Sequence, residues 1–124
     1  MTTEIPEKSW LSFCEQLKNK YRGAVSIRWI QPGGVLRFVA ENIPLRGLIF
    51  KKQKDRCNDL MTVETGEPGE RPSKHEIVEP FCVILRQDDE SGRYNELEIL
   101  SETGKTEITF TPGIDSGLVE KLAA

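Results

Sequence analysis

The sequence lacks the features that mark several common protein classes. Its three cysteines, Cys14, Cys57 and Cys82, are widely spaced and form no C-x-x-C pair, which argues against a disulfide framework or a zinc site and predicts reduced thiols. Its apolar runs, such as 81–85, are far too short to span a bilayer. The first residues hold no basic segment followed by an apolar one, so we expect no secretory signal and a cytoplasmic protein.

The chain also has no excess of positive charge and only one histidine. A formal net charge of −3 gives no general attraction to nucleic acid or anionic lipid, so we expect no membrane partner and do not favour a nucleic-acid partner. Nucleophile-elbow, phosphate-loop and calcium-loop spacings are all missing. His75 and Glu79 lie four residues apart, about 13 Å along a strand, which is too far for a dyad. We expect a protein that is not an enzyme, with no catalytic residue, metal or cofactor.

What is present is a strong strand pattern between residues 74 and 110. Two segments alternate apolar and polar residues, with Leu97, Ile99, Ile108 and Phe110 on one side and Glu96, Glu98, Glu107 and Thr109 on the other. This period predicts an antiparallel hairpin with one buried face and its glutamates in water. Gly104, between the two segments, suits the left-handed position of a short loop.

Other segments predict a covering helix and further strands. Trp10, Phe13, Cys14, Leu17 and Tyr21 recur on one helical face, which predicts an amphipathic helix over 7–21 capped at Gly23. Strands are expected at 24–30, 35–41, 45–50 and 60–65, and a short helix within 115–122. The predicted fold is α+β, mainly β, in a single domain over residues 1–124. An N-terminal helix packs on a strongly bent antiparallel meander, or a small barrel, of six to seven strands.

Two groups of residues are candidate sites. His75, Arg28 and Arg37 are candidates for ligand binding around a concave sheet face. Lys51, Lys52, Lys54 and Arg56 form the one basic cluster and are candidates for anion or nucleic-acid contact. Neither group has the spacing of an established motif.

The chain resembles a bacterial family catalogued as domain of unknown function 5335. The matching motifs are Thr3-Glu4-Ile5-Pro6, Ile43-Pro44-Leu45-Arg46-Gly47-Leu48 and His75-Glu76-Ile77-Val78-Glu79-Pro80-Phe81-Cys82-Val83. Thr103 departs from the aspartate that members usually carry before the late glycine, and 51–56 is less acidic than usual. The resemblance implies a small cytoplasmic bacterial protein and implies no activity, because the family has none assigned.

Three functions remain open on the sequence. The first is a non-enzymatic binding or adaptor module, with a protein partner or a second copy meeting an exposed strand edge or sheet face. The second is a small-ligand or anion-binding barrel that uses Arg28, Arg37 and His75. The third is a weak binder of single-stranded nucleic acid, which uses the basic cluster and Trp29.

Overall fold

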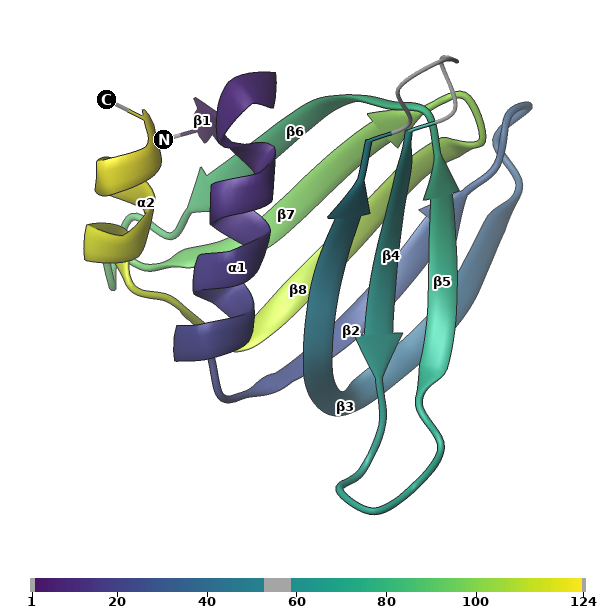
Figure 1. The fold of residues 1–124 in the computed structure, drawn as a ribbon, viewed down its shortest axis with the longest axis horizontal. Coiled ribbons are helices and arrows are strands. Elements are labelled where there is room, and N and C mark those ends of the chain that lie inside the picture. The colour runs from purple at the N-terminus through teal and green to yellow at the C-terminus, as the bar shows by residue number, and fades with distance from the viewer. Residues whose placement is uncertain (1, 53–58, 124) are drawn as a thin grey trace.

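One antiparallel sheet of eight strands, with a helix across one face, makes up most of the protein (Figure 1). The computed structural model describes residues 2–52 and 59–123. The strands are β1 (Thr2–Glu4), β2 (Ala24–Ile30), β3 (Leu36–Lys51), β4 (Leu60–Thr65), β5 (Ser73–Val78), β6 (Pro80–Gln87), β7 (Tyr94–Ser101) and β8 (Gly104–Ile114). The helices are the 3-10 turn η1 (Glu7–Ser9), α1 (Trp10–Lys20) and α2 (Ser116–Ala123). The strand order is β1-β6-β7-β8-β2-β3-β4-β5.

β3 is the strand on which the sheet bends. Its first half, from Leu36 to Pro44, pairs with β2, and its second half, from Leu45 to Lys51, pairs with β4. Register shifts interrupt both pairings, and Asn42 has a φ of 45°, a left-handed conformation that asparagine tolerates better than most residues. The sequence pattern predicted two strands separated by a break at 42–44. The break is a bend instead, because the bulges turn the chain without ending its pairing.

The bend folds the sheet over its own core without closing it. In Figure 1, β4 and β5 lie in front of β2 and the first half of β3. Side chains from the two halves meet inside, since His75 of β5 contacts both Thr106 of β8 and Trp29 of β2. β1 and β5 are the two ends of the strand order. The strongly bent antiparallel sheet is therefore confirmed, whereas the alternative of a small barrel is not, and the strands number eight rather than six to seven.

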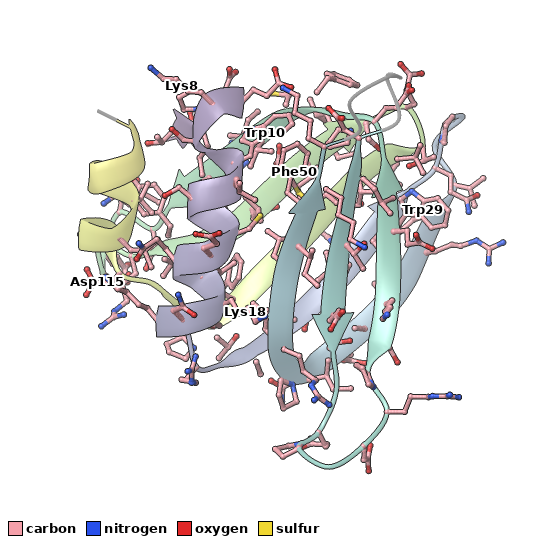
Figure 2. The ribbon with its side chains drawn as sticks, viewed as in Figure 1. Lys8, Trp10, Lys18, Trp29, Phe50 and Asp115 are labelled. Carbon is pink, nitrogen blue, oxygen red and sulfur yellow. The ribbon has the colours of Figure 1, made fainter. Side chains whose placement is uncertain are left out.

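α1 covers the core on the inner face of the sheet. Its buried side chains are Trp10, Phe13, Cys14 and Leu17, four of the five residues in the stripe that the sequence predicted. The fifth, Tyr21, is also buried but follows the helix. Trp10 donates a hydrogen bond from Nε1 to the Ile5 carbonyl at 2.8 Å, and its ring meets Phe50 edge to face at 5.4 Å (Figure 2). The helix begins later than predicted, because η1 occupies 7–9, and it ends at Lys20, because Tyr21 is extended. Gly23 is therefore not its cap.

The predicted hairpin is present as β7 and β8. Leu97 pairs with Ile108, and both side chains are buried. Gly104 has a φ of 116°, and a side chain there would collide with the carbonyl oxygen of Ile30 on β2. The short C-terminal helix is confirmed as α2. β1 was not predicted; it pairs with β6 and covers part of that edge.

The hydrophobic core is a single cluster that draws on α1 and both halves of the sheet. Helices of the length and apolarity that a bilayer requires are missing from the described residues.

Candidate functional site

The outer face of the sheet, opposite α1, carries a row of aligned charged residues. Arg28 of β2 pairs with Glu107 of β8, and Glu107 pairs with Glu98 of β7. Directly paired residues of antiparallel strands point to the same face, so these three side chains lie side by side. Lys105 and Arg86 lie next to this row, each within reach of Glu98. We call these five residues the charged network.

Short distances connect the charged network into one unit. Arg86 Nε lies 2.7 Å from Glu98 Oε1, and Arg28 Nη2 lies 3.0 Å from Glu107 Oε1. Lys105 Nζ lies between the two carboxylates, 3.6 Å from Glu98 Oε1 and 3.5 Å from Glu107 Oε2. Each carboxylate therefore has two cations, and the lysine is shared.

The charged network corrects the prediction that these glutamates lie in water. Glu98 is 5% exposed and Glu107 is 9% exposed, because the long cationic side chains lie across them. The hydrogen bond from Arg86 holds the pKa of Glu98 below its usual value. The pKa of the neighbouring Glu96 is shifted in the opposite direction. Burial raises it first, and the charges of Glu107 and Glu98 raise it further.

Glu96, Glu98 and Glu107 are spaced closely enough to hold a metal ion, with one carboxylate oxygen of each within 4.8 Å of the others. Carboxylate oxygens are ligands for hard cations such as Ca²⁺ or Mg²⁺. However, Arg28, Arg86 and Lys105 already supply positive charge to two of the three carboxylates. The arrangement fits an ion-pair network better than a metal centre.

The turn and strand next to the charged network expose an unusual amount of apolar surface. Val35, Leu36, Phe38 and Val39 are 56%, 44%, 78% and 39% exposed, and we call these four residues the hairpin patch. Phe38 pairs with Arg28, and Leu36 pairs with Ile30, so both lie on the outer face beside the network. Within the described residues, this half of β3 pairs with a strand on one side only.

The structure separates the three residues that were proposed to surround a ligand. His75 is buried: its Nε2 lies 3.1 Å from Thr106 Oγ1, and its ring packs on Trp29 at 5.3 Å. Arg37 pairs with Trp29 on β2, near His75, but its own side chain is exposed. Arg28 points to the opposite face with Glu107. Burial lowers the pKa of His75, because the charged imidazolium loses its hydration there.

The basic cluster is only partly described by the structure. Lys51 ends β3, Lys52 follows it, and both are exposed. Lys54 and Arg56 lie outside the described residues. Trp29, the aromatic residue proposed to act with them, is half-buried and donates from Nε1 to the Thr103 carbonyl at 2.8 Å, so its polar edge is already engaged.

Cys14 and Cys82 are free thiols in different surroundings. Cys14 lies in the core, where burial raises the pKa of its thiol to about 12. Cys82 is half-buried, and burial and then the charge of Glu4 raise its pKa. Both thiols therefore stay protonated and poorly nucleophilic near neutral pH.

The charged network and the hairpin patch were not predicted as sites. The alternating pattern correctly placed Glu98 and Glu107 on the face away from the core. The pattern could not show which cationic side chains lie across that face. Comparison of this chain with protein-family models, with curated proteins and with solved structures found no match. The resemblance to the uncharacterised bacterial family stays a prediction.

Proposed function

We propose that the protein is a non-enzymatic module that binds another polypeptide through the hairpin patch. The supporting observation is the exposure of Phe38, which is 78% accessible on the half of β3 that pairs on one side only within the part of the chain that the structure describes. Leu36 and Phe38 share the outer face, and apolar side chains that gather at one place on a surface are typical of interaction sites, whereas isolated ones are ordinary. An unpaired strand edge adds backbone donors and acceptors that an extended partner segment can use.

The charged network supports a partner that presents negative charge beside the segment that covers Phe38. Arg28 is about half exposed and lies beside Phe38, while Glu107 behind it is nearly covered. A partner that buries Phe38 therefore meets a basic rim first. Aromatic anchors surrounded by charged rims are common at protein interfaces.

The non-enzymatic assignment is supported by the surroundings of the groups that are chemically suited to catalysis. His75 is buried against Trp29 and Thr106 with no carboxylate among these contacts. Cys14 has a strongly raised pKa, and Glu98 is held in ion pairs. None of these described groups combines access to solvent with an activating partner, which nucleophilic and acid–base catalysis both require.

Photocrosslinking from the hairpin patch tests the proposal. A photoreactive phenylalanine analogue replaces Phe38 in one protein and Phe81 in another. Phe81 is a suitable control because it is 64% exposed but lies on β6, which β7, β8 and β2 separate from β3. We expect specific crosslinks from position 38 in cells, with light scattering showing whether the partner is a second copy. Equal crosslinking from both positions, together with a monomer at every concentration, would contradict the proposal.

A further inference from the structure

The end of the molecule where α1 finishes contains three adjoining cavities that share Arg22. The largest, of about 500 Å³, lies between the end of α1 and the start of α2 and includes Lys20, Arg93 and Asp115 in its lining. A second, of about 240 Å³, adds Lys18 and Arg46, and a third, of about 470 Å³, extends along Arg46. We call these three cavities together the Arg22 groove. Figure 2 labels Lys18 and Asp115 at this end of the molecule.

Positive charge is concentrated in the Arg22 groove, although the protein as a whole is acidic. Its lining includes five basic residues, Lys18, Lys20, Arg22, Arg46 and Arg93, and one acidic residue, Asp115. The whole chain has a formal net charge of −3. A concave surface lined by one sign of charge concentrates ions of the opposite sign.

The helix dipole explains only part of this concentration. Lys18 and Lys20 occupy the last turn of α1, where cations are favoured by the negative end of the dipole. Arg46 comes from β3 and Arg93 from the residue before β7, so the helix end does not account for them. Segments that are distant in the sequence bring five cations to one groove.

The three guanidinium groups are held in place by bonds that leave their charge available. Arg22 Nη1 donates to the carbonyls of Lys18 and Tyr21 at 3.0 and 2.9 Å. Arg46 Nη1 donates to the Glu70 carbonyl at 2.8 Å, and Arg93 Nη1 donates to the Gly113 carbonyl at 3.2 Å. A carbonyl has no net charge, and a guanidinium has five N–H donors, so each group retains donors for a ligand.

The acidic residue of the groove is engaged by the protein itself. Asp115 Oδ1 accepts a hydrogen bond from the Gly117 backbone N–H at 2.8 Å, at the start of α2. The apolar part of the largest cavity is formed by Tyr21, Pro112, Ile114 and Leu118. A ligand that matches this lining has an anionic group for the cations and a small apolar body for the floor.

We propose that the Arg22 groove binds small organic anions, namely carboxylates or phosphate monoesters attached to an apolar body. Its largest cavity has the volume typical of small-molecule sites, roughly 300–1,000 Å³. Guanidinium groups bind carboxylate and phosphate oxygens in pairs, which gives the site its selectivity for an anion over a neutral analogue. The site is independent of the hairpin patch and differs from the sequence-based ligand site at His75, Arg28 and Arg37.

Nuclear magnetic resonance titration tests the site with defined probes. Phenyl phosphate and benzoate are the anionic probes, benzyl alcohol is the neutral one, and sodium chloride at matched ionic strength controls for screening. The backbone amides of Gly113 and Gly117 line the largest cavity and report binding there. We expect saturable shifts of both amides with at least one anionic probe at millimolar concentration, and none with benzyl alcohol.

Substitutions identify the side chains that bind the anionic group of the probe. The double variant Lys20→Gln, Arg93→Gln should weaken binding of the anionic probe roughly tenfold or more, because each charged hydrogen bond contributes strongly. Arg71→Gln is the matched control, since Arg71 is exposed and lies outside the three linings. The proposal is overturned if sodium chloride reproduces the shifts, if benzyl alcohol binds equally well, or if the double variant keeps full affinity. The proposal is overturned as well if short oligonucleotides, titrated in the same way, shift these amides and neither anionic probe does.

Discussion

The two halves of β3 belong to one strand but have opposite surroundings. Residues 36–41 are mostly exposed, with Phe38 at 78%, whereas the second half buries Leu48 at 2% and Phe50 at 9%. The first half pairs with β2, whereas Phe50 of the second half meets Trp10 of α1 edge to face. The composition of the halves is similar, so position relative to α1, and not hydrophobicity, decides which half joins the core.

The largest effect is expected from truncating the same residue type in each half. Phe50→Ala removes a buried ring that meets Trp10 edge to face, and it should lower the free energy of unfolding by about 3–5 kcal/mol. Phe38→Ala removes a ring that water already surrounds, and it should change the same quantity by less than about 0.5 kcal/mol. Urea denaturation measures both. Equal losses would show that Phe38 also packs in the core, which would remove the basis of the proposed binding surface.

A smaller effect is expected at the bend between the halves. Asn42 has a φ of 45°, where a β-branched side chain is strained, so Asn42→Val should cost about 1–2 kcal/mol. Asn42→Gly is the matched control and should be nearly neutral, because glycine adopts this conformation freely. Asn42 is exposed, so neither change alters core packing. If both variants lose the same stability, the left-handed backbone is not what maintains the bend.

The smallest effect is expected at His75 of β5, whose side chain contacts Thr106 of β8 inside the folded sheet. The pKa of His75 lies below its usual 6.5 in the folded protein and near that value in the unfolded chain. The unfolded state therefore binds more protons. The contribution of His75 to the free energy of unfolding is fully present above about pH 6.5 and is lost as the pH falls below that value. His75→Gln keeps a side chain that can bond to Thr106 and does not titrate.

Denaturation of the wild type and His75→Gln between about pH 7 and about pH 5.5 measures this dependence. The variant should lose less stability than the wild type over this interval. Identical pH dependence would show that His75 is not the titrating group. Glu98 does not obscure the comparison, because its pKa lies below the usual carboxyl value and its own contribution is lost at lower pH.

The sequence predicted elements whose periodicity is local. Leu97 and Ile108 alternate with glutamates, so strands β7 and β8 and their buried face were predictable. β1 was not predictable, because three residues show no period and its pairing with β6 joins positions eighty or more residues apart. Pro44 was interpreted as a strand break, although proline is tolerated at bulged and bent positions of a strand.

The candidate sites were less predictable than the fold. Arg28 and His75 were identified as residues of interest, but which face each one occupies depends on the register between strands. Arg22, Arg46 and Arg93 are unremarkable in the sequence and are brought together only by the folded chain. Residues that come together from distant parts of the chain have no characteristic spacing that a single sequence could show.

The sharing of β3 between both parts of the sheet has a consequence for cooperativity. The same backbone supplies the ladder for β2 with its first half and the ladder for β4 with its second. If β4 and β5 detached, β3 would lose its support over Leu48 and Phe50, and the core under α1 would open. We therefore expect the two parts of the sheet to unfold together in one transition.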